Sequence, residues 1–174
     1  MKTSLFIFLC SILAIAISFK PEGNSMPSGL PVVPLADNAG DYRSGQLTEE
    51  QLKDVLQSDA INAVIRLNGD QGKDGEILST ADEQDLVESY FVEFYRFDAH
   101  SARDRAKLVK VLNERNALIH CRHGVHRTGA AVGQYLQQKG YTPAQIIAHL
   151  GWEQYNEQWR GKYREYYDIA VTPE

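Results

Sequence analysis

Apolar residues along the chain alternate between short β-branched or aromatic runs and longer segments with helical spacing. The runs predict strands at 42–45, 61–67, 91–97 and 117–120. Three- and four-residue apolar steps between and after them predict helices that start near 48, 79 or 80, 101, 128, 143 and 152. Alternating strands and helices predict an α/β fold, with a mostly parallel central sheet of about four or five strands flanked by helices.

The first 40 residues differ in character from the rest. A positive start at Met1-Lys2, an apolar run over 5–17 and an A-x-A site at 14–16 indicate a signal peptide over 1–18. The run is shorter than the roughly 20 residues of a membrane span, so we expect cleavage and a periplasmic or secreted protein, although an uncleaved anchor stays open. A Pro/Gly-rich tether is expected over 19–40 and one globular domain over 41–174.

Composition and cysteine count narrow the classes of function. The 174 residues carry 18 basic and 23 acidic side chains, for a net charge of −5, which disfavours nucleic-acid binding. The chain has two cysteines, Cys10 and Cys121. If the signal is removed, Cys121 has no partner within the chain for a disulfide. It is therefore either inert in the core or reactive.

Residues 120–129, His-Cys-Arg-His-Gly-Val-His-Arg-Thr-Gly, lie between a predicted strand and a predicted helix. A loop in that place presents backbone N–H groups and a helix N-terminus to an anion. Gly124 permits a tight turn, and the positive field favours the thiolate form of Cys121. Arg127 can bind two oxygens of a tetrahedral anion. This set of groups suits attack on a phosphoryl group.

The Cys-x5-Arg-Thr pattern of this loop resembles the signature loop of cysteine-dependent phosphatases, the superfamily of protein tyrosine and dual-specificity phosphatases. Residues 42–46, Tyr-Arg-Ser-Gly-Gln, are similar to an early strand motif of small bacterial members. The resemblance implies their fold, a phosphocysteine formed on Cys121, a Thr128 hydroxyl that helps to expel the thiolate, and no metal or cofactor. It also implies substrate binding by the following residues: Arg43, Arg122, His123, Gly124, Val125 and His126.

The resemblance also implies an upstream aspartate as general acid. Asp98 follows a predicted strand, and Asp104 occupies the last position of a capping box that starts at Ser101. Because Asp104 already has a capping role, we choose Asp98. Asp104 and His100 remain alternatives, since geometry decides which group reaches the leaving oxygen.

Charge along the chain bears on the substrate. Residues 96–127 contain eight Lys or Arg against three acids, whereas 70–93 contain eight acids against one lysine. A basic site region favours a polyanionic phosphate ester. The loop is also similar to that of the exported phosphatase-like phytases, which place a substrate-facing arginine where this chain has Arg66. We therefore expect inositol polyphosphate (phytate) as substrate and no nucleic-acid partner.

Other functions fit parts of the pattern. A tyrosine or dual-specificity phosphatase is the first alternative, and a catalytically dead phosphate-binding module is an alternative of another class. A rhodanese or an arsenate reductase has a similar loop. A zinc site is a further interpretation, with His120, Cys121, His123 and His126 as its ligands. Near the C-terminus, an aromatic stripe indicates a helix packed on the sheet in preference to a ligand-binding wall: Trp152, Tyr155, Trp159, Tyr163 and Tyr166.

Overall fold

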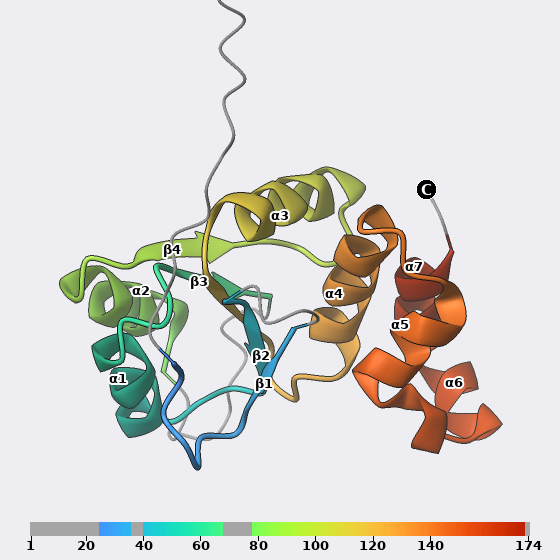
Figure 1. Ribbon diagram of the computed structural model, residues 1–174, viewed down its shortest axis with the longest axis horizontal. Coiled ribbons are helices and arrows are strands. Elements are labelled where there is room, and N and C mark those ends of the chain that lie inside the picture. Colours follow the sequence, from blue (N-terminus) through green and yellow to red (C-terminus); the bar gives the residue numbers. More distant parts are fainter. Residues whose placement is uncertain (1–24, 36–39, 68–77, 173–174) are drawn as a thin grey trace, which may run out of the picture.

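The computed structural model describes residues 25–35, 40–67 and 78–172; the predicted signal peptide at 1–18 lies outside them. A central sheet separates two helical layers, with α1 and α2 on one side and α3 to α7 on the other (Figure 1). The strands are β1 (Val32–Pro34), β2 (Tyr42–Ser44), β3 (Ala63–Arg66), β4 (Glu93–Arg96) and β5 (Ala117–His120). The helices are α1 (Glu49–Gln57), α2 (Thr80–Ser89), α3 (Ala102–Glu114), α4 (His126–Gln138), α5 (Pro143–Leu150), a 3-10 turn (Trp152–Gln154), α6 (Glu157–Lys162) and α7 (Arg164–Val171).

The sheet has the order β1-β2-β5-β3-β4, and only β1 runs antiparallel to its neighbour. The predicted α/β class with a mostly parallel sheet is confirmed. The structure differs from the expected tether over 19–40, because Val32–Pro34 pairs with β2 and Leu35 is buried. The sequence does not predict this short strand, because four nearby prolines argue against one.

Alternate side chains of each central strand contribute to two hydrophobic cores, one on each face of the sheet. Ala63 and Ile65 of β3 contact the core under α3, α4 and α5, whereas Val64 contacts the core under α1 and α2. In β5, Ile119 and Leu118 divide in the same way. Successive strand residues point to opposite faces, so this alternation also fixes which way polar side chains at the strand ends point.

The helices begin close to the predicted positions, and polar side chains cap them. Thr48 and Thr142 form complete capping boxes, and the Ser79 and Ser101 hydroxyls accept from the backbone N–H three residues later. The helix expected from 152 onward is not continuous, since Asn156 caps a new helix and the helix breaks again at Tyr163.

The C-terminal helix α7 packs on α4 rather than on the sheet. A Cβ atom placed on Gly133 of α4 would lie 2.5 Å from the Ala170 Cβ, so glycine permits this close approach. In the same way, Gly129 leaves room for the Trp152 ring. The C-terminal aromatic segment is thereby packed beside the helix that follows the Cys121 loop. Within the described part of the chain, no helix has both the length and the apolar character of a membrane span.

Candidate active site

The loop from Cys121 to Val125 joins the carboxyl end of β5 to the N-terminus of α4. Cys121 is buried, with 3% of its surface exposed. Val125 is the N-cap of α4 and makes no side-chain cap hydrogen bond, so the N–H groups of the first turn stay available to an anion. Gly124 has φ +67°, and a Cβ there would lie 2.5 Å from the Gly45 nitrogen. Only glycine fits this turn without displacement of the backbone.

The strand motif at 42–46 positions this loop. An Arg43 Nη atom donates to the Gly124 carbonyl at 3.2 Å, and a second donates to the Leu150 carbonyl at 3.4 Å. The Gln46 N–H donates to the Arg122 carbonyl at 3.2 Å. The half-buried guanidinium of Arg43, for which we expected a role in substrate binding, connects the loop to the end of α5. Burial also lowers the pKa of Arg43.

The expectation of a substrate-facing Arg66 does not agree with its position. Arg66 and His120 are partners in the β3–β5 register, and both are buried. By strand alternation they point to the same side as Val64 and Leu118, toward α2. There Arg66 contacts the Glu83 carboxylate, and His120 Nε2 lies 2.6 Å from Glu83 Oε1. Arg66 stabilises the strand end under the loop instead of reaching into the site.

The buried carboxylate of Glu83 makes stability depend on pH. Burial raises its pKa, but contacts with His120, Gln46 and Arg66 outweigh burial and give a net pKa below the usual value. Its contribution is therefore complete above the unfolded-state pKa of about 4.3 and is lost as the pH falls through the lower folded-state value. We expect Glu83→Gln to lower the free energy of unfolding by about 3 kcal/mol at pH 7, and by less at pH 3, in urea titrations.

Glu88→Gln is the matched control for this prediction, since Glu88 is an exposed carboxylate on the same helix. Its effect is expected to stay within about 0.5 kcal/mol at both pH values. A Glu83→Gln deficit that is the same at pH 3 and pH 7 would contradict the titration of Glu83 in this window.

Cys121 opens onto a cavity of about 290 Å³ with one aromatic wall. The rings of His126 and Tyr163 stack with centroids 3.7 Å apart. Burial lowers the pKa of His126, and neighbouring His123, Arg127 and Lys162 lower it further, which favours the neutral form of the ring. The lining residues come from the loop, from α4 and from the C-terminal aromatic segment: Cys121, Arg122, His123, His126, Arg127, Tyr163 and Tyr166.

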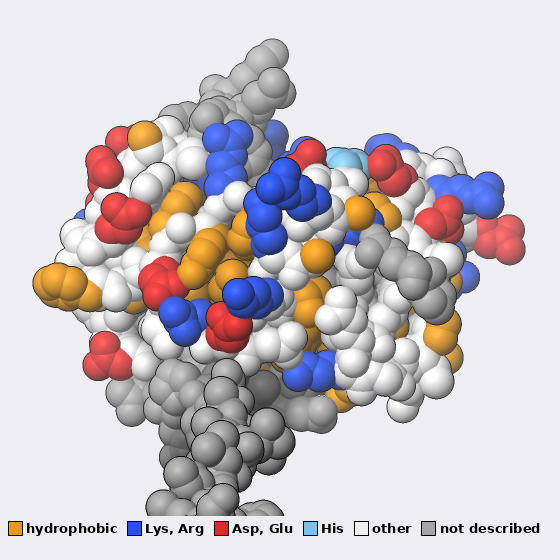
Figure 2. All heavy atoms as spheres, turned by 90° about the horizontal axis from the view of Figure 1, so that it is seen from above, with side chains coloured by type: hydrophobic (Ala, Val, Ile, Leu, Met, Phe, Trp, Pro, Cys, Tyr) orange, Lys and Arg blue, Asp and Glu red, His pale blue; other side chains and the backbone are white. Residues whose placement is uncertain are grey.

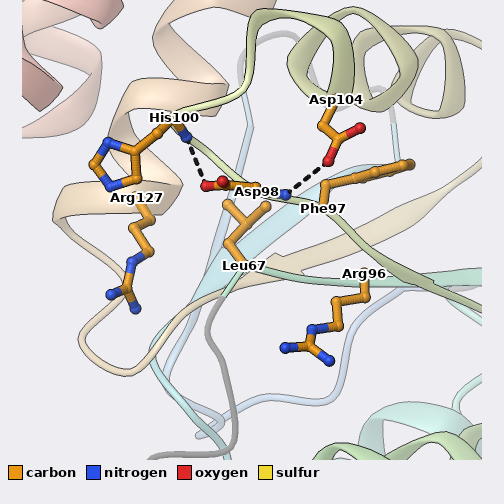
Figure 3. Close-up of a pocket in the computed structure, with 7 residues that line it drawn as sticks. All are labelled: Leu67, Arg96, Phe97, Asp98, His100, Asp104 and Arg127. Atoms are coloured by element: carbon orange, nitrogen blue, oxygen red, sulfur yellow. Dashed lines mark hydrogen bonds between the residues drawn. The ribbon is translucent and has the colours of Figure 1, made fainter.

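Arg127 also lines a second cavity, of about 380 Å³ (Figure 3). Figure 3 shows the side chains of Arg127 and Arg96 extending on either side of Leu67, below the loop that carries Asp98 and His100. Neither guanidinium forms a hydrogen bond or an ion pair with any residue that the structure describes. Both charges are therefore available to a ligand. Phe97 and Asp104 complete the lining.

Both candidate acids lie at this second cavity, but their carboxylates have different partners. The His100 N–H donates to Asp98 Oδ1 at 2.9 Å. Asp104 Oδ2 accepts from the Asp98 N–H at 3.3 Å, and its other oxygen lies 3.5 Å from Lys107 Nζ. Both Asp104 oxygens therefore have partners, and the expected capping box is incomplete, since Ser101 caps α3 but the Asp104 carboxylate bonds the Asp98 N–H instead. The second oxygen of the Asp98 carboxylate has no hydrogen-bond or ion-pair partner among the described residues, which favours Asp98 as the acid.

Two further residues bear on the chemistry of the loop. The Thr128 hydroxyl is fully buried and has no hydrogen-bond partner among the described residues. The zinc interpretation required His120 beside Cys121, but His120 faces Glu83. In the described ranges, no three His, Cys, Asp or Glu residues form a cluster that could hold a metal ion.

Sequence reasoning missed three features of this region. Glu83 lies on the buried face of α2, one turn before Val87. A carboxylate on a buried face needs polar partners, and the neighbouring strands end in Arg66 and His120. Tyr163 and Tyr166 line the Cys121 cavity, although the spacing favoured a helix packed on the sheet. The contacts of His100 with α7 had no signal in the sequence, because they depend on where α7 packs.

Comparison with known proteins agrees with this geometry. Residues 37–164 match the sequence profile of the tyrosine phosphatase family. Among curated protein sequences, none matches the chain. A DUF442 phosphatase structure from Shewanella putrefaciens aligns at 20% identity, covering 80% of this chain and 86% of that one, with a TM-score of 0.59.

Two other solved structures have the same fold. TpbA from P. aeruginosa aligns at 16% identity over 87% of this chain and 90% of that one, with a TM-score of 0.57. The core catalytic domain of the PP-IP phosphatase SIW14 from S. cerevisiae aligns at 14% identity over 86% and 84%, with a TM-score of 0.53. The site and fold are those of a cysteine-dependent phosphatase. The chain belongs to the tyrosine phosphatase family.

Proposed function

We propose that the chain is an exported phosphomonoesterase that removes phosphate from inositol polyphosphates through a phosphocysteine intermediate. The observation that carries the proposal is the position of Arg127 between two cavities, one above Cys121 and one that contains Arg96 and Asp98. A substrate can place its reacting phosphate over the loop and extend its remaining anionic groups toward Arg96. The sequence pattern at 1–18 supports export.

In the first step, the Cys121 thiolate attacks phosphorus and the bond to the leaving oxygen breaks. The loop N–H groups and Arg127 bind the three nonbridging oxygens, where charge develops in the transition state. Asp98 donates a proton to the leaving oxygen. The product alcohol departs, and phosphate remains bonded to the Cys121 sulfur.

In the second step, water attacks the phosphocysteine and Asp98 accepts a proton from it. The bond between phosphorus and sulfur breaks and restores the thiolate. The Thr128 hydroxyl, which is buried without a partner among the described residues, supplies a hydrogen bond to the departing sulfur. Both steps balance with water as the only co-reactant.

Two lysines of the basic run have acidic partners on their own helix, α3. Lys107 lies 3.5 Å from Asp104, and Lys110 lies 4.0 Å from Glu114 on the same helix. Figure 2 shows Lys and Arg side chains interspersed with Asp and Glu on this side of the molecule. Part of the basic run is therefore an ordinary solvated helix face, and the argument for a polyanionic substrate depends on Arg96 and Arg127.

The test is a substrate comparison with Arg96→Gln and, as charge-matched control, Lys110→Gln. Without added metal, the wild type is expected to release phosphate from inositol hexakisphosphate. Arg96→Gln is expected to raise KM for that substrate about tenfold, the effect of a lost charge-assisted contact, and to affect p-nitrophenyl phosphate much less. The control is expected to match the wild type. Equal KM values for Arg96→Gln and the wild type on both substrates would contradict the subsite.

A tyrosine or dual-specificity phosphatase is the second candidate, favoured by the aromatic wall of the Cys121 cavity. Tyr163, Tyr166 and His126 can pack against an aryl ring. TpbA, a structural neighbour, has been solved in complex with pTyr. Phosphate release from phosphotyrosine peptides but not from inositol hexakisphosphate would favour this function. Binding of both without turnover would favour the dead phosphate-binding module.

A further inference from the structure

His100 connects the loop between β4 and α3 to the C-terminal helix. Its Nδ1 atom lies 2.6 Å from Glu165 Oε1, and its Nε2 atom lies 3.1 Å from the Tyr166 hydroxyl. The His100 and Tyr166 rings also contact each other, with centroids 5.0 Å apart. Both nitrogens of one ring are thus bonded to adjacent residues of α7, which defines the position and the orientation of the ring.

The backbone of His100 in turn defines the position of the Asp98 carboxylate. The His100 N–H donates to Asp98 Oδ1 at 2.9 Å, and the Ser101 N–H donates to the Asp98 carbonyl at 3.1 Å. Residues 98–101 therefore form one hydrogen-bonded turn. A displacement of His100 moves the carboxylate with it.

A buried arginine fixes the other side of the same turn. Arg105 Nη1 donates to the carbonyls of Ala99 and His100 at 3.1 and 2.9 Å. Arg105 Nε donates to the Gln134 side chain of α4 at 2.7 Å. The turn is thus bonded to α4, which carries Arg127, on its inner side and to α7 on its outer side. Tyr166 also lines the Cys121 cavity, so it contacts both parts of the site.

We propose that Glu165 and Tyr166 are positioning residues that hold the Asp98 carboxylate at the leaving oxygen through His100. The inference rests on the proposed function, in which Asp98 is the general acid. Both residues lie just beyond the family match, which ends at residue 164. The contact therefore comes from a C-terminal segment of this chain that the family profile does not include.

The test uses two substrates that differ in their need for an acid. The p-nitrophenolate of p-nitrophenyl phosphate departs as a stable anion, whereas the alkoxide of glycerol 2-phosphate must be protonated. Glu165→Gln keeps the shape of the side chain but removes its charge. We expect it to lower kcat on glycerol 2-phosphate about tenfold, because small misplacement of a catalytic group is costly, and to lower kcat on p-nitrophenyl phosphate much less. Tyr166→Phe is expected to show the same selectivity.

Asp168→Asn is the matched control, since Asp168 is an exposed carboxylate on the same helix that pairs only with exposed Arg164 in the described structure. It is expected to match the wild type on both substrates. In an Asp98→Asn background, Glu165→Gln is expected to add no further loss, because the two act through one carboxylate. Thermal unfolding midpoints check that each variant is folded.

The outcomes separate this inference from the proposed function. If Asp98→Asn lowers kcat equally on both substrates, the assignment of Asp98 as the acid fails. If Asp98→Asn lowers kcat mainly on glycerol 2-phosphate but Glu165→Gln and Tyr166→Phe do not, the positioning role is overturned while the acid assignment stands. A selective loss in all three, absent in Asp168→Asn, supports the inference.

Discussion

Replacement of Cys121 by serine is expected to abolish phosphate release while the protein stays folded. Serine fills nearly the same buried volume, so packing under the loop changes little. Its hydroxyl is a much weaker nucleophile than a thiolate. We expect kcat to fall by about 10⁵-fold or more, the order seen when the nucleophile of a covalent mechanism is removed. A phosphate-release assay on p-nitrophenyl phosphate measures this loss.

A binding measurement distinguishes loss of the chemical step from loss of phosphate binding. The loop N–H groups and Arg127 remain in Cys121→Ser, so inorganic phosphate is expected to raise its thermal unfolding midpoint about as much as that of the wild type. If the variant retained more than about 1% of wild-type turnover, a reduction far smaller than removal of a nucleophile gives, Cys121 would not be the attacking group.

Arg127→Lys is expected to have the second-largest effect. Lysine preserves the positive charge but has no planar pair of donors for two phosphoryl oxygens. Arg127 has no partner among the described residues and lines both cavities, so the substitution removes contacts to substrate and no structural bond. We expect kcat to fall about 10²- to 10³-fold, equivalent to about 3–4 kcal/mol of transition-state stabilisation.

The control for Arg127→Lys is Arg103→Lys, which makes the same substitution on the exposed side of α3. Steady-state kinetics on p-nitrophenyl phosphate are expected to match the wild type for the control. A higher KM with unchanged kcat in Arg127→Lys would mean that Arg127 binds ground state and transition state equally. That result would contradict a clamp on the transition state.

The local parts of the site could be predicted from the sequence. The strand before Cys121, the tight turn at Gly124 and the helix after Val125 follow from a β-branched run, a glycine and an apolar period over a few residues. The helix starts near 48, 79, 101 and 143 were equally local and are confirmed. Such features depend on neighbours in the chain, which the sequence displays directly.

The side-chain directions at Arg43 and Arg66 could not be read in this way. Strand alternation points Arg66 toward α2, where it pairs with Glu83. To predict this direction from sequence, the start of the strand must be known to within one residue. Arg43 bonds to carbonyls of residues 124 and 150, which are far away in the sequence. Contacts of this kind depend on tertiary packing and have no local signal.

The C-terminal aromatic residues show the same limit. Their spacing is that of a packed helix, and Trp152 is indeed buried against α4. Asn156 and Tyr163, however, divide the segment into shorter helices. This division turns Tyr163 and Tyr166 toward the Cys121 cavity. A periodic pattern gives the apolar face of a helix, but not the point at which the helix ends.

Alkylation of Cys121 tests the central claim most directly. With iodoacetate at mildly acidic pH and peptide mapping by mass spectrometry, we expect carboxymethylation at Cys121 that inorganic phosphate slows, because both anions occupy the same loop. Arg127→Lys is expected to weaken this protection. A sulfur that iodoacetate leaves unmodified, or modifies at one rate with and without phosphate, would contradict a nucleophilic Cys121 at the base of a phosphate site.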